Sequence, residues 1–388
     1  MTQPSLLHGV LVPLITPFAA DGQVAAGALG TLAGEVLDAG AAGIVALGTT
    51  AEAVTLDTAE KQTVIEICAG ACGPRGAALV VGAGSSDTRA SAAALTGLAR
   101  WPQITGALVP VPYYTRPGEA GVIAHFTRLA AESPVPLVIY HVPYRTAQPL
   151  SGAALRELGL LPNVAGVKLA TGGLGPEAVE LLGDCPPGFA VLAGDDLYLS
   201  PLLALGAAGG ILASAHLATG RFAQLAAAWA RGDVITARRC GHVLAPLSAA
   251  AFAEPNPAVI KGALHALGRI PTPDVRLPLL PAGTESVDAL LTRLADLGGD
   301  GDRCATAGSD HAACSPAPAS LRQAAVGHRP AAQAMLRNSA SRASMRWRKV
   351  TSTDSGRPKP PAASSDASPW QAARHIRMAW MSSASARP

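Results

Sequence analysis

Eight short apolar runs alternate with Ala- and Leu-rich stretches over residues 10–213, and this alternation constrains the fold more than any other feature. Short runs rich in β-branched and aliphatic residues, apolar on both faces, predict buried strands. The predicted strands are Val10–Ile15, Gly43–Leu47, Ala78–Gly82, Gly106–Val111, Leu137–Val142, Ala165–Leu169, Ala190–Ala193 and Gly210–Ala213. The intervening stretches predict helices, among them Ala26–Ala39, Thr58–Ala71, Ala120–Ala131 and Phe222–Ala230.

Buried strands that are separated by helices pair in parallel through right-handed crossovers. Eight such units in about 220 residues fit a closed (β/α)8 TIM barrel better than an open doubly wound sheet. A doubly wound sheet would show a dinucleotide fingerprint after its first strand, and the nearest candidate, Gly82–Asp87, lacks the third glycine and follows another strand. We therefore predict an α/β fold with a barrel over residues 1–232 and further helices over residues 233–298.

The composition changes abruptly near Gly298. Residues 1–298 hold 17 Lys and Arg against 22 Asp and Glu, a net charge of −5, whereas residues 299–388 hold 13 against 5, a net charge of +8. The second part is rich in Ser, Ala, Pro and Arg and has no sustained period, so we expect a disordered tail over 299–388. Its Trp347, Trp370 and Trp380 lie among scattered basic residues. Polar coil, or an out-of-frame extension of the gene, is favoured over nucleic-acid binding.

Several classes of protein are excluded by composition. Hydrophobic residues make up 49% of the chain and charged residues 15%, which excludes general disorder. No apolar run reaches the roughly 18 residues that a membrane helix needs, and the first ten residues lack the features of a signal peptide. Six cysteines without a Cys-x-x-Cys pair argue against a disulfide framework and a zinc cluster. We expect a soluble, cytoplasmic protein that does not bind membranes.

Polar residues follow several of the predicted strands, at the barrel end where active sites lie. These segments are Gly48–Thr50 after the second strand, Pro112–Tyr114 after the fourth, Tyr140–Arg145 at the fifth, Lys168 in the sixth and Gly194–Asp196 after the seventh. Two tyrosines, an arginine and one of the few lysines of the body are therefore expected around one barrel mouth.

The lysines narrow the chemistry, because residues 1–298 contain only Lys61, Lys168 and Lys261. Lys61 follows a capping pattern at a helix start and is expected to be a solvated surface charge. Lys261 lies in a helical stretch and is expected to be structural or exposed. Lys168 sits inside an apolar strand, where desolvation favours the neutral amine that attacks a carbonyl as a Schiff-base nucleophile. The plainer alternative is a buried ion pair with a carboxylate such as Asp195 or Glu52.

Hydroxyl groups near this lysine could move the protons that imine formation requires. Tyr140 lies on the adjacent strand, and Thr49 and Tyr114 could supply a relay to it. Tyr140 alone could equally be an aromatic residue of the barrel rim. Thr49 with Glu52 also fits a capping box, whose exposed backbone N–H groups could hold a carboxylate. Arg145 suits a bidentate grip on a second carboxylate, and a surface ion pair is its alternative.

At these residues the sequence resembles the superfamily of dihydrodipicolinate synthase and N-acetylneuraminate lyase over residues 6–297. The motifs that carry the resemblance are GTTAE at 48–52, PYYTRP at 112–117, YHVPYRT at 140–146, GVKLATG at 166–172, GDD at 194–196 and EPNP at 254–257. The tyrosine, valine-proline and arginine-threonine of the third motif are most similar to the dihydrodipicolinate synthase branch. The sequence departs from that family's common pattern at Ala51, His141, Tyr144 and Leu169.

The resemblance implies a class I, Schiff-base lyase that condenses pyruvate with L-aspartate 4-semialdehyde to 4-hydroxy-tetrahydrodipicolinate, a step of lysine and diaminopimelate biosynthesis. Lys168 would form the imine with pyruvate. Tyr140, Thr49 and Tyr114 match the family's proton relay, in which the tyrosine at the position of Tyr114 comes from a neighbouring subunit. The family further implies a homotetramer and no metal or organic cofactor.

Four more positions match residues that bind substrate in this family. Thr50 would help to hold the pyruvate carboxylate, and the backbone carbonyl of Ile211 would face the pyruvate. Arg145 would bind the carboxylate of the aldehyde, and Gly194 would lie against the substrate. A pyruvate aldolase or lyase acting on a keto-deoxy sugar acid is the first alternative, since Tyr144 could reshape the aldehyde pocket. An inactive barrel with a scaffold or regulatory role is the second.

Overall fold

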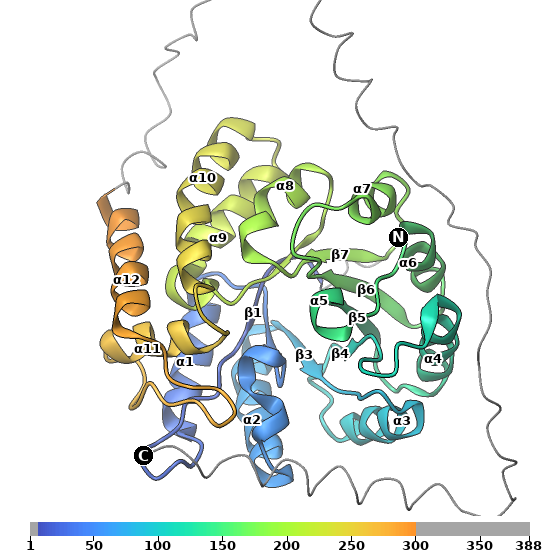
Figure 1. Ribbon diagram of the computed structural model, residues 1–388, viewed down its shortest axis with the longest axis horizontal. Coiled ribbons are helices and arrows are strands. Elements are labelled where there is room, and N and C mark those ends of the chain that lie inside the picture. Colours follow the sequence, from blue (N-terminus) through green and yellow to red (C-terminus); the bar gives the residue numbers. More distant parts are fainter. Residues whose placement is uncertain (1–6, 300–388) are drawn as a thin grey trace, which may run out of the picture. The chain divides into compact units, whose positions relative to one another are not determined.

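The computed structural model describes residues 7–299, and its eight strands form a closed barrel in which each strand pairs in parallel with its neighbour in chain order (Figure 1). The last strand pairs with the first and closes the barrel. The strands are β1 (Gly9–Pro13), β2 (Gly43–Ala46), β3 (Ala78–Gly82), β4 (Gly106–Pro110), β5 (Leu137–His141), β6 (Val164–Leu169), β7 (Ala190–Ala193) and β8 (Gly209–Ile211). The predicted TIM barrel is confirmed, and each predicted strand overlaps an observed one.

Helices surround the barrel and follow it along the chain (Figure 1). The α-helices are α1 (Ala26–Asp38), α2 (Thr58–Cys72), α3 (Thr88–Gly97), α4 (Gly118–Glu132), α5 (Pro143–Thr146), α6 (Gly152–Gly159), α7 (Pro176–Gly183), α8 (Leu199–Ala204), α9 (Ala215–Ala230), α10 (Val234–Ala251), α11 (Ala258–Ala266) and α12 (Thr284–Gly299). Short 3-10 turns are η1 (Thr49–Ala51), η2 (Ala53–Thr55), η3 (Gly73–Arg75), η4 (Leu98–Arg100) and η5 (Asp196–Tyr198).

The helix predictions hold apart from one boundary. Helix α9 begins at Ala215, well before the predicted Phe222, because it consists of two helical pieces that meet at a kink with non-helical backbone at Ala218. Three helices, α10 to α12, follow the barrel, as the sequence predicts for residues 233–298. Residues 300–388, nearly all of the predicted tail, lie outside the described residues.

The strands bury side chains on both faces, as their composition predicts. One face contributes Leu11, Val45, Val80, Leu108 and Val138 to a core inside the barrel. The other face packs against the helices in a second, larger core. Because successive side chains of a strand point to opposite faces, the position of a residue along its strand decides which core it joins. This alternation separates residues that face the barrel interior from those that only support it.

The start of α2 shows the local chemistry that sets a helix boundary. The Asp57 side chain accepts a hydrogen bond from the Glu60 backbone N–H, and the Glu60 carboxylate accepts one from the Asp57 N–H. This is the capping box that the sequence predicts, and it satisfies two amide groups that have no partner within the helix. Lys61 follows it at a half-buried position. The helix after β2 therefore starts at a fixed point, which limits the freedom of the turn between them.

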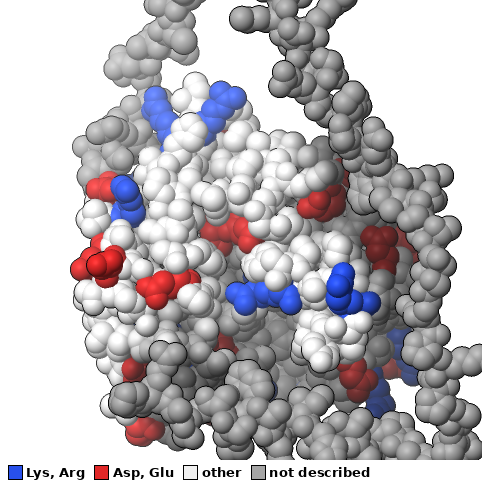
Figure 2. All heavy atoms as spheres, viewed as in Figure 1, with Lys and Arg blue, Asp and Glu red and all other residues white. Residues whose placement is uncertain are grey.

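Charged residues are few on the surface and of both signs. Figure 2 shows one face of the molecule, where Lys and Arg are dispersed among Asp and Glu and among wide uncharged areas. Over residues 7–299, no helix is both long and apolar enough to cross a membrane. Within residues 7–299, Cys68, Cys72 and Cys185 form no disulfide bond. Burial raises the pKa of Cys72 to about 11, so this thiol stays protonated and unreactive near neutral pH.

Candidate active site

Lys168 is a buried amine without a partner. Its position in β6 pairs in register with Tyr140 of β5 and with Leu192 of β7, both of which belong to the core inside the barrel. The side chain is only 7% exposed. Among the described residues it forms no hydrogen bond and no ion pair, and its Nζ lies over the ring of Tyr140. No carboxylate in this part of the chain is bound to the amine to fix its charge, which suits a nucleophile.

The ion-pair alternative for Lys168 is wrong for both carboxylates that the sequence offered. Glu52 pairs with Lys261 instead, at 2.7 Å between Oε1 and Nζ. Asp195 accepts a hydrogen bond from the Gly172 backbone N–H at 2.7 Å and forms no ion pair with Lys168. The sequence could not distinguish these arrangements, because Glu52 and Lys261 lie 209 residues apart.

Tyr140 lies directly beside the lysine. The Lys168 Nζ is 4.5 Å from the centroid of the Tyr140 ring, and the tyrosine is buried on the inner face of β5. In the described part of the chain its hydroxyl has no hydrogen-bond partner, so the phenol is available to a bound substrate. The structure thus brings together Lys168, the predicted nucleophile, and Tyr140, the first member of the predicted relay.

The end of β7 lies tightly against Lys168. A Cβ atom on Gly194 would come within 2.9 Å of the Lys168 Cγ and 2.7 Å of the Leu169 carbonyl oxygen. The Gly194 N–H donates to that same carbonyl. Any other residue at 194 would push the strand end away from the lysine, so the glycine permits the close approach. The missing side chain of Gly194 thus lets the end of β7 lie against Lys168, and its contact with a substrate stays a prediction.

Two aspartates follow Gly194 and bring negative charge near the lysine. Burial raises the pKa of Asp195, and Lys168 opposes that shift. Burial raises the pKa of Asp196 to about 6. One Asp196 oxygen accepts from the Ser214 backbone N–H at 2.6 Å, and the other is buried with no partner among residues 7–299. These carboxylates therefore lie close to Lys168 without being bound to it.

The turn after β2 carries the two predicted threonines. Thr50 is buried and Thr49 is exposed. The Thr50 Oγ1 accepts a hydrogen bond of 2.8 Å from the Asn256 amide, and the Ala51 carbonyl accepts one of 2.8 Å from Thr16. Gly48, not Thr49, precedes the turn, and the turn has no side-chain cap. The capping box suggested for Thr49 and Glu52 is therefore wrong, because the Glu52 carboxylate is directed to other partners.

Arg145 and Tyr144 form an exposed pair at the end of β5. Both lie on the short helix α5, which begins at Pro143 directly after the strand. The Arg145 guanidinium lies 5.6 Å from the centroid of the Tyr144 ring. Partial burial raises the pKa of Tyr144, and Tyr140 and Asp195 contribute to the same shift. Arg145 forms no ion pair within residues 7–299, so the alternative of a surface ion pair is wrong.

Among the predicted site residues, Tyr114 and Ile211 have very different solvent exposure. Ile211, the last residue of β8, is buried in the core inside the barrel. Tyr114, after β4, is 92% exposed and adopts a left-handed backbone conformation, with φ of 68°. Within the described residues its hydroxyl has no partner. A large aromatic side chain left in solvent by its own chain is what a residue serving another subunit would show.

The sequence comparisons decide the family. Residues 6–296 match the model of the dihydrodipicolinate synthetase family. The chain belongs to this family. The enzyme activity and the lyase class follow from that membership.

Individual members of the dihydrodipicolinate synthetase family are similar along most of this chain. The 4-hydroxy-tetrahydrodipicolinate synthase of Synechococcus elongatus is 38% identical over 300 residues, which cover 77% of this chain and 99% of the relative. The chloride-inhibited dihydrodipicolinate synthase of Acinetobacter baumannii, solved with pyruvate, is 32% identical with a TM-score of 0.72, covering 75% and 99% of the two chains. A monomeric dihydrodipicolinate synthase variant is 26% identical with a TM-score of 0.72, covering 76% and 97%.

The departures from the common family pattern fall in different layers of the barrel. Leu169 joins the core between barrel and helices, so it takes no place at the mouth beside Lys168. His141 is also fully buried, one residue beyond the inward-facing Tyr140. Both ring nitrogens of His141 lack partners among the described residues, and burial lowers its pKa to about 4. Of these three departures, Tyr144 is the exposed one.

Sequence reasoning missed the supporting role of the segment after α10. Asn256 contacts Thr50, and Lys261 contacts Glu52 of the same turn. Lys261 was expected to be structural or exposed. It is fully buried, so the exposed alternative is wrong. The available signal was the EPNP motif at 254–257, which places an amide side chain between two prolines.

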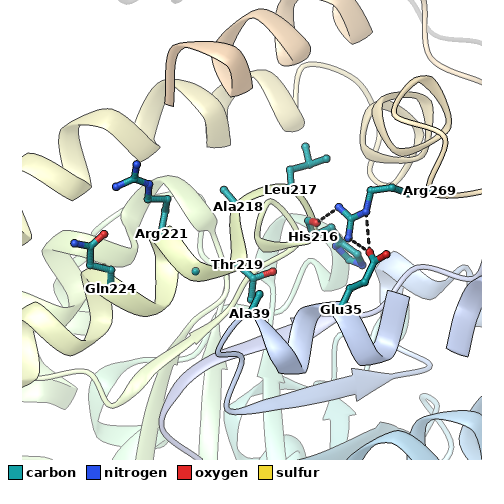
Figure 3. Close-up of a pocket in the computed structure, with 10 residues that line it drawn as sticks. Glu35, Ala39, His216, Leu217, Ala218, Thr219, Arg221, Gln224 and Arg269 are labelled. Atoms are coloured by element: carbon teal, nitrogen blue, oxygen red, sulfur yellow. Dashed lines mark hydrogen bonds and ion pairs between the residues drawn. The ribbon is translucent and has the colours of Figure 1, made fainter. Parts of the chain in front are cut away.

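A hollow outside the barrel is not part of this site. It has a volume of about 560 Å³ and lies between α1 and α9 (Figure 3). Arg269 lies at one end of it, where it pairs with Glu35 and donates to the His216 carbonyl oxygen, and no predicted site residue lines it. His216 accepts from the Ile15 N–H through Nε2, so its Nδ1 carries the proton donated to Ala213. These groups are satisfied by one another, and their role is to join α1, α9 and the chain after α11.

Proposed function

We propose that the protein is a 4-hydroxy-tetrahydrodipicolinate synthase, which condenses pyruvate with L-aspartate 4-semialdehyde. The observation that carries the proposal is the buried, unpaired amine of Lys168 beside the Tyr140 ring. The names of the relatives support the reaction, and the pyruvate bound to the Acinetobacter baumannii protein supports the first substrate. The product belongs to lysine and diaminopimelate biosynthesis, and we expect the protein to act in the cytoplasm.

Imine formation is the first step. The neutral Lys168 amine attacks the keto carbon of pyruvate, and the resulting carbinolamine loses water to give the imine. One proton must reach the departing oxygen and others must leave the nitrogen. Tyr140 is the nearest phenol and exchanges these protons with Thr49 and, from a neighbouring subunit, Tyr114. Thr50 and the turn that carries it hold the pyruvate carboxylate, and the Ile211 carbonyl faces the bound substrate.

Carbon–carbon bond formation follows from the same imine. Loss of a methyl proton gives an enamine, whose methylene carbon attacks the aldehyde carbon of the second substrate. The protonated imine nitrogen takes up the electron pair during proton loss, so the lysine itself is the electron sink. Arg145, whose guanidinium lies over Tyr144 without an ion pair, binds the carboxylate of the aldehyde substrate bidentately.

Cyclisation releases the enzyme. The amino group of the former aspartate semialdehyde attacks the imine carbon, and the Lys168 amine leaves as the six-membered ring closes. Hydrolysis by water is not required for this release, because the substrate's own nitrogen replaces the lysine nitrogen. The wall formed by Gly194 keeps the strand end close to Lys168, so the ring forms against a backbone surface.

The assembly that we infer is a homotetramer built from two dimers, with Tyr113 and Tyr114 at the tighter interface. The exposed Tyr114 side chain supports a homotetramer. One similar protein is described as a monomeric variant, so the oligomeric state has to be measured. Light scattering should give the mass of four chains. A monomer with full activity would exclude a relay that uses a neighbour's Tyr114.

A coupled assay with pyruvate and L-aspartate 4-semialdehyde tests the proposed reaction. We expect turnover that depends on both substrates. Tyr144 favours one competitor, since a phenol at the mouth could bind a hydroxyl group of a keto-deoxy sugar acid. No turnover with the semialdehyde, together with cleavage of such a sugar acid to pyruvate, would replace the proposed substrate. No reaction with pyruvate at all would favour an inactive barrel.

A further inference from the structure

The segment between α10 and α11 fixes the orientation of one substrate-binding hydroxyl. The Asn256 Nδ2 donates to the Thr50 Oγ1 at 2.8 Å. Because that oxygen accepts from Asn256, the hydroxyl proton of Thr50 is left to donate elsewhere. A carboxylate has only acceptor oxygens, so it needs this donor. In the described part of the chain the Asn256 side chain makes no other hydrogen bond, so its amide acts on Thr50 alone.

The same turn is held at its far end through Glu52. This residue has a left-handed backbone conformation, with φ of 54° and ψ of 33°, which a non-glycine residue keeps only where its surroundings hold it. Its Oε1 accepts from Lys261 at 2.7 Å, and its Oε2 accepts from the Arg276 backbone N–H at 2.7 Å. Both oxygens of this buried carboxylate are thus bound by the chain after the barrel.

Lys261 is built into the fold to meet this carboxylate. Its side chain is 0% exposed, and its Nζ lies 4.0 Å from the centroid of the Phe18 ring. Burial lowers the pKa of Lys261, and Glu52 opposes that shift. A buried ion pair of this kind adds little stability compared with apolar residues of the same volume, but it does fix one geometry. Stability alone therefore does not explain why two charges are buried here.

We propose that Asn256 and the Lys261–Glu52 pair are positioning residues, which hold the turn of Thr50 so that its hydroxyl donates to the carboxylate of the substrate. The inference rests on the proposed function, since it takes the ligand of Thr50 to be the pyruvate carboxylate. Asn256 sets the direction of the hydroxyl, and the ion pair sets the position of the turn that carries it. The C-terminal segment thereby takes part in recognition of the first substrate without touching it.

Asn256→Ala and Asn256→Asp test the role of the amide. Asn256→Ala frees the Thr50 hydroxyl, and we expect the KM for pyruvate to rise about tenfold, with kcat changed less than about twofold. Asn256→Asp keeps the shape but takes the Thr50 proton and adds a charge that repels the substrate. The KM of Asn256→Asp for pyruvate should therefore rise further, to about a hundred times the wild-type value. Unchanged KM values in both variants would overturn the proposal.

Asn163→Ala is the matched control at the opposite end of the barrel. Asn163 precedes β6, and its amide donates to three backbone carbonyls, of Ala130, Ser133 and Val135. Removing it should lower the thermal midpoint and leave the KM for pyruvate unchanged. If Asn256→Ala behaves like this control, with a lower midpoint and the wild-type KM, its role is structural only and the inference is wrong.

The ion pair needs a variant that still folds. The double variant Glu52→Gln with Lys261→Met removes both charges together and leaves no isolated buried charge. We expect it to fold, with a KM for pyruvate raised about tenfold. A wild-type KM in the folded double variant would exclude a positioning role for the pair. The wild-type protein is treated in parallel with pyruvate and borohydride. Failure of the wild type to form a reduced adduct would refute the proposed function, whereas a normal adduct with unchanged variants would refute only this inference.

Discussion

The two buried lysines of the barrel unit have opposite surroundings. Lys261 is fully buried, bound to Glu52 and placed over the Phe18 ring. Lys168 is nearly as buried and lies over the Tyr140 ring, but among the described residues no carboxylate forms an ion pair with it. One amine is bound to a carboxylate, and the other has no such bond within residues 7–299. Burial of a lysine is therefore not the signature of a nucleophile, and the absence of a partner is the more informative feature.

Selective placement of carboxylates maintains this difference. Glu52 lies at the end of the turn after β2 and is directed away from the barrel mouth, toward α11. Asp195 and Asp196 lie near Lys168, yet each is bound to a backbone N–H of another segment. Acidic groups close to the lysine thus lower the cost of a transient cation without forming a lasting ion pair.

Removal of the reactive lysine should have the largest effect. We expect Lys168→Ala to lower kcat/KM by about 10⁴-fold or more, as loss of a covalent nucleophile does in other enzymes. The coupled assay with pyruvate and aspartate semialdehyde measures it. Lys61→Ala is the matched control and should retain wild-type activity, because Lys61 forms no ion pair in the described part of the chain. Comparable activity in Lys168→Ala would make Lys168 an ordinary buried residue.

Replacement of each buried lysine by methionine should change the free energy of unfolding differently at the two positions. Lys261→Met leaves Glu52 buried without a counter-charge, and we expect the free energy of unfolding to fall by about 3–5 kcal/mol. Lys168→Met removes an unpaired buried amine, so stability should be unchanged or raised by about 1–3 kcal/mol. Urea denaturation at pH 7 compares the two variants directly. Equal losses would mean that Lys168 has a stabilising partner after all.

His141 is a further buried group whose ring nitrogens have no partner among the described residues, on the face of β5 opposite to Tyr140. Its pKa is lowered to about 4 by burial, from an ordinary value of 6.5. The unfolded chain therefore takes up a proton first as the pH falls, and the native state loses about 3 kcal/mol between pH 6.5 and 4. His141→Leu should remove this loss of stability at low pH and leave activity at pH 7 unchanged. Denaturation curves at pH 7 and pH 4.5 test it, and an unchanged pH dependence would contradict it.

Arg145 should affect only the second half of the reaction. We expect Arg145→Ala to raise the KM for aspartate semialdehyde about ten- to a hundredfold, the range for loss of a charged hydrogen bond. The reduced adduct with pyruvate should form as in the wild type, because Lys168 and Tyr140 are untouched. An equal loss of pyruvate trapping would place Arg145 in the pyruvate site. Tyr144→Ser is the companion variant that tests whether the phenol restricts the aldehyde.

The barrel could be predicted from the sequence, and so could the faces of its strands, because both depend on local pattern. The eight apolar runs fix the strands, and alternation along each strand places Tyr140 and Lys168 on the inner face. The partners of Glu52 could not be predicted, since they come from segments more than 200 residues away. The start of α9 was missed because its first turn is separated from the rest by the kink at Ala218.

Mass spectrometry after treatment with pyruvate and borohydride tests the central claim most directly. Borohydride reduces an imine to a stable amine, so the lysine that reacted keeps the carbon atoms of pyruvate. We expect one added pyruvate unit per chain, found on the peptide that contains Lys168, and no adduct on Lys261 in the same sample. An unmodified Lys168, or an adduct on Lys261, would contradict the account.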